Sequence, residues 1–206
     1  ILGPEASQAQ IDAKREELGL NDSYFEQLFR YIKNIVTKFD FGTSYKTGKS
    51  VISEVLGRFP TTLLLTLCSM AIATVVGITL GIISAVKQYS VFDYIATFLS
   101  LVGVSIPSFW LGLMLMLVFA LNLSWFPSSG FYGPQYWVLP SIAIATIPIS
   151  TITRTTRSAM LEVIRQDYMR TARAKGLGEG AVIFKHGLKN TLIPVITIIG
   201  IQLGRT

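Results

Sequence analysis

No charged side chain occurs between Tyr94 and Thr153. A helix that crosses a membrane needs about 20 apolar residues without charge, and this stretch is long enough for two such helices. Only 15% of all residues are charged and 50% are hydrophobic, whereas a soluble domain carries about 25% charged residues. The sequence therefore predicts an all-α, polytopic helix bundle in a membrane rather than a soluble globular domain.

Four apolar runs are candidates for membrane segments. The first is uncharged between Arg58 and Lys87. The second contains Pro107, which removes a backbone hydrogen bond and should kink or break the helix. The last would reach only about 22 Å as a helix, short of the ~30 Å hydrocarbon core. We therefore expect the chain to be cut at its back, and also at its front, where no initiator methionine stands. The predicted segments are residues 61–86, 93–123, 138–153 and 190–206.

Two glycines in the first segment, Gly77 and Gly81, have GxxxG spacing. Small residues at this spacing allow helices to approach closely in lipid. The same spacing also arises in an ordinary apolar helix whose glycines have no packing role. The residues alone leave both interpretations open.

Residues 1–57 differ in composition from residues 58–206, the expected transmembrane domain. As far as Arg58, the chain holds eight basic and eight acidic residues. The run "SYFEQLFRYIKNIVTKF", from Ser23 to Phe39, places apolar residues at helical spacing and predicts an amphipathic helix. We expect residues 1–57 to form a small water-facing segment on one side of the membrane.

Basic residues in the loops predict the orientation, because Lys and Arg are enriched on the cytoplasmic side. Residues 154–189 contain eight basic residues against three acidic ones, while the aromatic loop at residues 122–137 contains no basic residue. We therefore expect residues 154–189 to be cytoplasmic and, tracing the spans back, residues 1–57 to be extracytoplasmic. The basic residues of the N-terminal segment formally oppose this rule, although acidic residues balance them.

The basic segment 154–189 is organised beyond a plain loop. Residues 159–175 have the pattern of one helix, and the glycines of "KGLGEG" then interrupt it. The run "AVIFKHGLKN" predicts a second short helix with Val182, Ile183 and Phe184 as an apolar tip. Such a tip can project into the groove of a partner. A basic loop held by anionic lipid is the alternative, and the residues alone favour neither.

Two runs in this segment, "YMRTARAKGL" and "HGLKNTLIPV", resemble the cytoplasmic EAA loop of permeases of binding-protein-dependent ABC transporters. The resemblance is strongest to the dipeptide/oligopeptide/nickel branch. Arg170 and Thr171 replace the glutamate and first alanine of the general motif, while Ala172 and Gly176 match it. Further similar pieces, in the expected order over nearly the whole chain, are "DFGTSY", "RFPTTLLLTL", "SIPSFWLGL", "WFPSSG" and "RTTRSAMLEV".

This resemblance implies the transmembrane domain of a type I ABC importer, with its first and last helices missing from this chain. Residues 179–187 would be the coupling helix that sits in a cleft of a separate cytoplasmic ATPase subunit. ATP would be bound by that partner, because this chain has no G-x-x-x-x-G-K-[ST] phosphate loop and is a transport subunit rather than an enzyme. The residues expected at the coupling contact are Arg170, Thr171, Ala172, Lys175, Gly176, Gly178, Glu179, Val182, Ile183, Phe184 and Lys185.

The expected contact motivates two variants, Gly178→Pro and Phe184→Asp, which should abolish transport while leaving membrane insertion intact. His186, the only histidine in the sequence, is interpreted as a surface or docking residue rather than a metal ligand.

The resemblance also places the translocation path between this subunit and a homologous second permease subunit. Ser105, Pro107 and Ser108 are candidate lining residues, and the alternative is that Pro107 only bends a packed helix. Peptides delivered by an extracellular binding protein are the expected substrate, with nickel or a nickel chelate as the second choice. An intramembrane enzyme is a distant alternative. The expected location is the bacterial or archaeal cell (inner) membrane, with no bound cofactor or metal and no nucleic acid.

Overall fold

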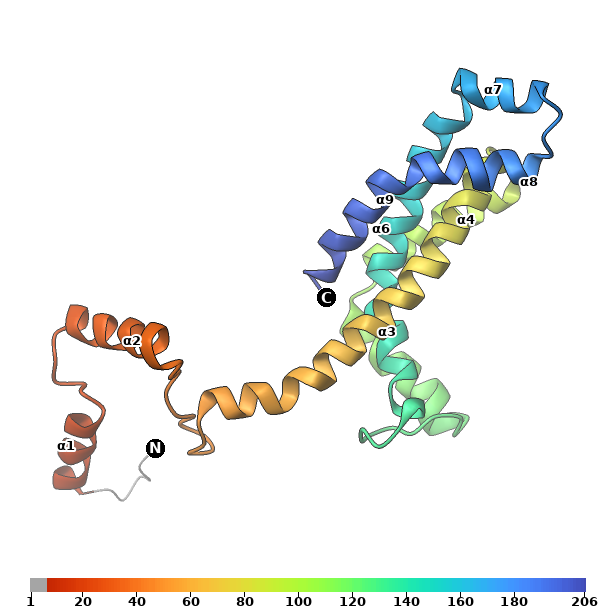
Figure 1. Ribbon diagram of the computed structural model, residues 1–206. Helices are drawn as coiled ribbons and strands as arrows, with labels where there is room; N and C mark the ends of the chain where they lie inside the picture. The colour runs from red at the N-terminus through yellow and green to blue at the C-terminus, as the bar shows by residue number, and fades with distance from the viewer. Residues whose placement is uncertain (1–6) are drawn as a thin grey trace. The chain divides into compact units, whose positions relative to one another are not determined.

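A computed structural model describes residues 7–206 of the chain (Figure 1). The described residues form helices and loops, with one isolated β-bridge between Thr43 and Ser50. The chain divides into two units, Ile1–Thr62 and Leu63–Thr206, where the sequence predicts a boundary after residue 57. Each unit is described by itself.

The N-terminal unit contains α1 (Gln8–Glu17) and α2 (Tyr24–Lys38). Ser23 caps α2, because its hydroxyl accepts a hydrogen bond from the backbone N–H of Glu26 while the Glu26 carboxylate accepts from the N–H of Ser23. The predicted amphipathic helix is therefore confirmed in place and extent. Arg30 binds back to the preceding turn, with its guanidinium 2.5 Å from the Asp22 carboxylate.

Helix α3 (Val51–Val86) is longer than the first predicted segment, because it continues through Pro60 toward its N-terminus. Gly77 and Gly81 are buried in it. A Cβ atom at Gly77 would lie 2.8 Å from Ile152, and one at Gly81 would lie 2.5 Å from Thr156. The packing interpretation of the GxxxG spacing is thereby confirmed, since both glycines allow α3 to approach the helix that carries Ile152 and Thr156.

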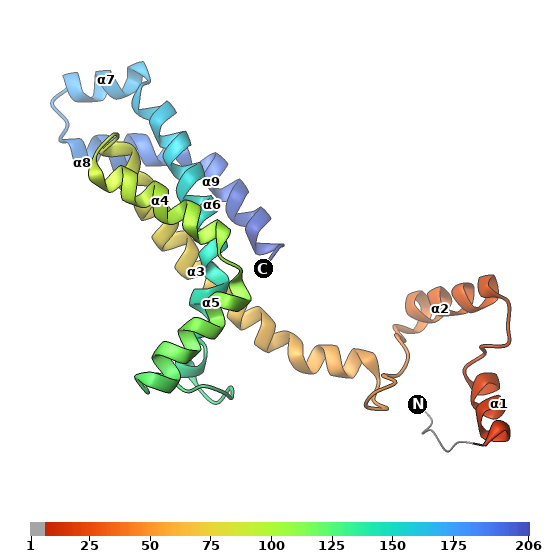
Figure 2. The same ribbon diagram turned by 180° about the vertical axis from the view of Figure 1, so that it is seen from behind.

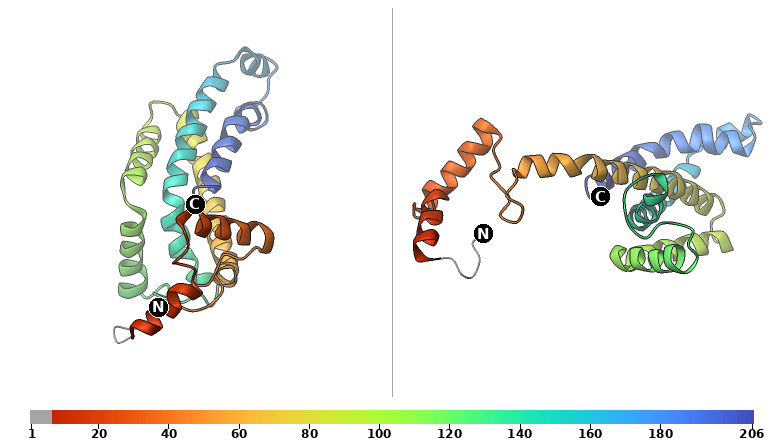
Figure 3. Two further views of the ribbon diagram at one scale, coloured as in Figure 1. Left: turned by 90° about the vertical axis from the view of Figure 1, so that its left-hand side faces the viewer. Right: turned by 90° about the horizontal axis from the view of Figure 1, so that it is seen from below.

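That helix is α6 (Val138–Ile164), which lies at the centre of the second unit, Leu63–Thr206. We call this unit the membrane unit. Helices α4 (Val91–Ser105) and α5 (Ser108–Leu115) contact α6 on one side and α9 (Lys189–Leu203) on the other (Figure 3). The main apolar cluster joins three helices, with Met70 and Ala73 from α3, Ala145 and Ile152 from α6, and Val195 from α9.

The second predicted segment is broken at the proline. Helix α4 (Val91–Ser105) ends before Pro107, and α5 (Ser108–Leu115) begins after it and continues as the π-helix η1 (Met116–Asn122). The two halves are bent by 102°. The prediction that Pro107 kinks or breaks this helix is confirmed. Figure 2 shows α4 and α5, the two halves, from behind.

The predicted third segment, 138–153, lies within α6, which runs on to Ile164. The predicted last segment, 190–206, overlaps a longer helix. Glu179–Leu203 is continuous over 25 residues and is long and apolar enough to cross a membrane, as are α3 and α6. The bent pair of α4 with α5 and η1 makes a fourth candidate span. The remaining elements are η2 (Pro134–Tyr136), α7 (Asp167–Ala174), α8 (Glu179–Ala181) and η3 (Val182–Leu188).

Candidate functional site

The basic segment after α6 folds into a helical hairpin (Figures 1 and 2). After α6 ends at Ile164 the chain turns, because Gln166 has an extended backbone (φ −72°, ψ 149°), and α7 begins at Asp167. The carboxylate of Asp167 lies in the first turn of α7, where the helix dipole favours an acid. The prediction of one helix over residues 159–175 is therefore wrong, since the turn lets α7 fold back against η3.

Glycines end α7, as the sequence predicts. Gly176 has φ +78°, a conformation that other residues rarely adopt. Its N–H donates to the Arg173 carbonyl at 2.9 Å, and the Leu177 N–H donates to the Ala172 carbonyl at 3.4 Å, the hydrogen bonds of a Schellman motif. Gly178, by contrast, has φ −64°, which proline also adopts. This geometry removes the physical reason for expecting Gly178→Pro to abolish transport.

An ion pair spans this turn. The Nε of Arg173 donates to a Glu179 carboxylate oxygen at 2.6 Å, and Nη2 donates to the other oxygen at 3.4 Å. The hydrogen bonds that Arg173 donates to the Glu179 carboxylate raise the pKa of its guanidinium above the ordinary value. Both side chains are solvent-accessible, so the pair contributes little to stability. It does hold the end of α7 beside the start of α8.

The apolar tip is not exposed as a whole. Val182 is fully buried against Met169 and Ala172 of α7. Ile183 is also buried, in a cluster with residues of α3 and α6 that includes Met160. The expectation that Val182 and Ile183 insert into a partner is therefore wrong, because the chain's own helices already cover them. Ala172, a third expected contact residue, is buried in the same way.

Phe184 remains exposed, with 62% of its surface accessible. The other expected contact residues around it are also exposed or, for Gly176 and Gly178, form the exposed turn. His186 is half-buried. Among the expected contact residues, the exposed side chains are thus mostly basic or polar, with Phe184 the aromatic one. We call these exposed residues the outer face, and they are Arg170, Thr171, Lys175, Gly176, Gly178, Glu179, Phe184 and Lys185.

An ion pair between a buried aspartate and a half-buried arginine lies beside the hairpin. Arg157 of α6 donates from Nε to one oxygen of Asp93 at 2.7 Å and from Nη2 to the other at 2.8 Å. The Asp93 oxygens also accept from the hydroxyl of Ser84 and from the backbone N–H of Tyr89, the latter at 3.0 Å. Since Ser84 belongs to α3 and Asp93 to α4, three helices meet at one carboxylate. We call these four residues the polar clamp.

Sequence reasoning missed the clamp. It placed Asp93 at a membrane boundary and counted Arg157 among the loop charges. A signal was present, because Asp93 is the only acidic residue between Glu54 and Glu162, and a lone acid at the end of an apolar segment requires a partner when buried. The sequence offered several basic residues as that partner, and spacing does not choose among them.

The candidate path residues lie at the break between α4 and α5. Ser105, Pro107 and Ser108 are exposed there, and the Ser105 hydroxyl donates to the Leu101 carbonyl at 2.9 Å. None of the three lines the cavity of about 430 Å³ that the structure forms nearby. Whether they face a translocation path stays a prediction.

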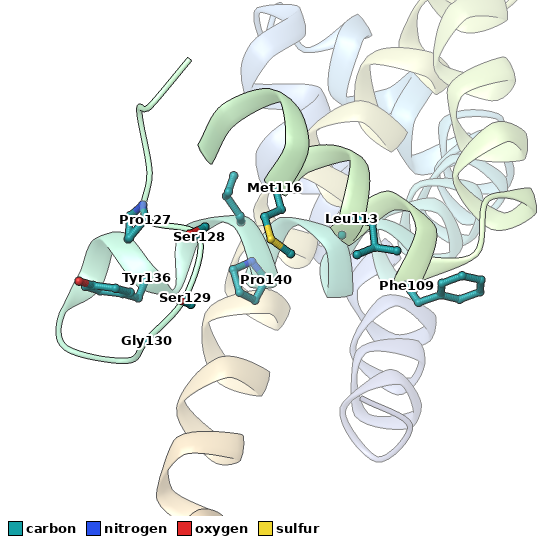
Figure 4. A pocket seen from close by; sticks show the side chains of 11 residues that line it. Phe109, Leu113, Met116, Pro127, Ser128, Ser129, Gly130, Tyr136 and Pro140 are labelled. Atoms are coloured by element: carbon teal, nitrogen blue, oxygen red, sulfur yellow. The ribbon is translucent and has the colours of Figure 1, made fainter. Parts of the chain in front are cut away.

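That cavity lies between α5, the 127–130 loop and the start of α6 (Figure 4). Its wall is mostly apolar, with two serine side chains from the loop. It is at the end of α6 opposite the hairpin, since it includes Leu139 and Pro140 while the hairpin follows Ile164. The remaining lining residues are Phe109, Gly112, Leu113, Met116, Pro127, Ser128, Ser129, Gly130 and Tyr136.

Comparison with known proteins gives one family. Residues 77–206 match the model of the "binding-protein-dependent transport system inner membrane component". The chain is 43% identical over 232 residues to the dipeptide transport system permease protein DppB of Alkalihalophilus pseudofirmus, covering 99% of this chain and 69% of the relative.

Two further relatives agree. The oligopeptide transport system permease protein AppB of Bacillus subtilis is 43% identical over 214 residues, with 98% of this chain and 67% of the relative covered. The glutathione transport system permease protein GsiC of Escherichia coli K12 is 40% identical over 204 residues, covering 99% and 66%. The chain thus spans about two thirds of the length of these relatives.

The match covers more than half of the chain, and it includes the polar clamp and the whole hairpin. The resemblance inferred from the motifs and the all-α membrane fold are both confirmed. The chain belongs to the binding-protein-dependent transport system inner membrane components, and it is a multi-pass permease subunit of an ABC importer.

Proposed function

We propose that the permease containing this chain carries short peptides across the membrane. Support comes from the three relatives above, which are named for dipeptides, oligopeptides and glutathione, itself a tripeptide. None of these three is named for nickel, so peptides are preferred over nickel or a nickel chelate.

The outer face of the hairpin is the proposed docking site for a cytoplasmic ATPase subunit. The observation that carries this role is the burial pattern. Val182 and Ile183 anchor the hairpin to the chain's own helices, while Phe184 is left exposed. Aromatic side chains and arginine are typical of binding hot spots, and the outer face contains both, in Phe184 and Arg170. Because Ile183 packs against α3 and α6, a force on the hairpin would be transmitted to these two helices.

Two further partners complete the proposal, and ATP is bound by the ATPase subunit and not by this chain. A homologous second permease subunit forms the other wall of the path, with Ser105, Pro107 and Ser108 as candidates on this side. An extracellular binding protein delivers the peptide. The positive charge of residues 154–189 supports placing the hairpin in the cytoplasm.

The test is uptake by the complete transporter reconstituted in liposomes. A radiolabelled dipeptide is supplied with the binding protein, and ATP is enclosed with the ATPase subunits. We expect accumulation that depends on ATP and is lost in Phe184→Asp. Accumulation of nickel but no peptide would contradict the proposed substrate, and unchanged uptake by Phe184→Asp would contradict the proposed docking site.

A further inference from the structure

We propose that α2 lies flat in the membrane–water interface, with its apolar face among the lipid acyl chains. The helix separates its residues sharply. Six large apolar residues fall on one side of the helical wheel, and the charged residues fall on the other. The six, which we call the apolar face of α2, are Tyr24, Phe25, Leu28, Phe29, Ile32 and Val36.

This face is uncovered. Its residues have between 50% and 87% of their surface accessible, and no residue of α2 is buried. The neighbouring helix α1 cannot supply a matching surface, because "QAQIDAKREE" contains one large apolar residue, Ile11. Fully burying a large apolar side chain is worth roughly 1.5–3 kcal/mol, so six exposed ones are a strong driving force for a second apolar phase.

Polar contacts at the N-terminus of α2 stabilise the helix without lipid. The capping box of Ser23 and Glu26 closes its N-terminus. Gln27 donates to the Asp22 carbonyl at 2.9 Å, and Arg30 donates to the Gly19 carbonyl at 3.1 Å. These contacts come from the polar side and fix the turn that precedes α2. The apolar face is thus presented as one preformed surface.

The charges indicate lipid rather than a protein groove. The polar side carries three basic residues. Arg30 is paired with Asp22, and Lys33 and Lys38 stand against one acid within α2, Glu26. Basic residues opposite a Phe- and Leu-rich face are the pattern of helices that lie in the interface, where they attract anionic headgroups. Tyr24 at the edge of the face also has a polar end suited to the headgroup level.

Chain continuity keeps α2 close to a bilayer. It ends at Lys38, and α3 begins at Val51 and contains a candidate membrane span. The connection is therefore short, and the helix needs only to rest on the surface its own chain enters. The proposal does not depend on which side of the membrane α2 occupies, nor on the transported substrate.

The test uses the purified full-length permease with its partner subunits in nanodiscs of phosphatidylcholine and phosphatidylglycerol. Cys68 is the only cysteine in the sequence, so a Cys68→Ser background allows one NBD fluorophore to be attached at an introduced cysteine. Phe25→Cys reports on the apolar face. Thr37→Cys, at an exposed position about 120° around the helix from Phe25, is the matched control on the polar side.

We expect the label at position 25 to emit at shorter wavelength than the label at position 37. It should also lose intensity when the lipids carry a doxyl quencher. Quenching should be stronger with the doxyl group near the carbonyl end of the acyl chain than near its methyl end, because an interfacial helix is buried only about 5–10 Å deep.

Two results overturn the proposal. A blue-shifted label at position 25 that doxyl lipids do not quench means that a protein surface, such as a binding protein or the second permease, covers the face. Water-like emission at both positions means that the face is uncovered. Val36→Cys gives a second position on the same face if Phe25→Cys perturbs the helix. Since the readout uses neither ATP nor peptide, its failure leaves the proposed transport function untouched.

Discussion

Asp93 and Arg157 are separated by 64 positions in the sequence, yet they form a two-pronged ion pair with N–O distances of 2.7 and 2.8 Å. Asp93 is 3% exposed. With Ser84 and the Tyr89 amide it joins α3, α4 and α6 at the end of the bundle from which the hairpin emerges. Ile183 of the hairpin packs near this point, on Ile82 and Ala85 of α3.

Removing the carboxylate should loosen this end of the bundle. Asp93→Asn leaves Arg157 without its counter-charge. Breaking a fully buried pair on one side costs about 3–5 kcal/mol, and the loss here should be smaller because 29% of the Arg157 side chain is accessible to solvent. We expect a lower thermal unfolding midpoint in detergent. Arg157→Lys should have an intermediate effect, because an ammonium group cannot form the two-pronged contact.

The matched control is Glu162→Gln on the same helix as Arg157. Glu162 is exposed, and surface substitutions of this kind usually change stability by less than about 0.5 kcal/mol. An Asp93→Asn midpoint equal to that of Glu162→Gln would show that the clamp does not hold the helices together.

The two sides of the hairpin should respond differently to the same substitution. Val182→Asp places a carboxylate in a fully buried site against Met169 and Ala172, so the protein should be destabilised by several kcal/mol or fail to accumulate. Phe184→Asp changes an exposed side chain and should leave the unfolding midpoint nearly unchanged. Midpoints of both variants in detergent check this, and equal destabilisation would contradict the burial pattern.

The two glycines of the turn should also differ. Gly176 has φ +78°, and a β-branched side chain in that conformation costs about 1–2 kcal/mol. Gly176→Val should therefore distort the Schellman turn and reduce uptake. Gly178→Ala should be tolerated, because φ is −64° and no atom lies within 4 Å of the added Cβ. Peptide uptake by the two variants, measured in the same assay, tests this prediction. A greater loss of uptake in Gly178→Ala than in Gly176→Val would contradict the turn geometry.

Close packing of α3 on α6 predicts a second contrast between glycines. A Cβ at Gly81 would lie 2.5 Å from Thr156 and 2.8 Å from the Thr153 carbonyl, so Gly81→Ala should cost about 1–3 kcal/mol through overpacking. Gly57, in the same helix, has open space around it. Gly57→Ala should be neutral or stabilising, since alanine is the better helix former by about 1 kcal/mol. A reversed order of melting midpoints would refute the packing.

Local rules predicted much of this fold. The amphipathic α2, the break at Pro107 and the glycine end of α7 follow from spacing, proline geometry and backbone freedom, which act over a few residues. The motifs around Arg170 and Pro194 identified the family. The relatives and the family model confirm that identification.

Long-range packing set the remaining features. The pairing of Asp93 with Arg157 needs α4 and α6 side by side, and a sequence does not say which of eight basic residues in 154–189 returns to that site. The inward direction of Val182 depends in the same way on the turn at Gln166, which brings α7 back over η3. An exposed tip and a buried tip have the same local sequence pattern, so only the arrangement of helices distinguishes them.

The most direct test of the docking role is photo-cross-linking in the complete transporter. A benzophenone group is attached at Phe184→Cys in the Cys68→Ser background, and at Tyr132→Cys, an exposed position in the aromatic loop, as the control. We expect the label at position 184 to cross-link to the ATPase subunit and the label at position 132 to leave that subunit unlabelled. Cross-linking from position 132 and none from position 184 would contradict both the docking surface and the orientation of the chain.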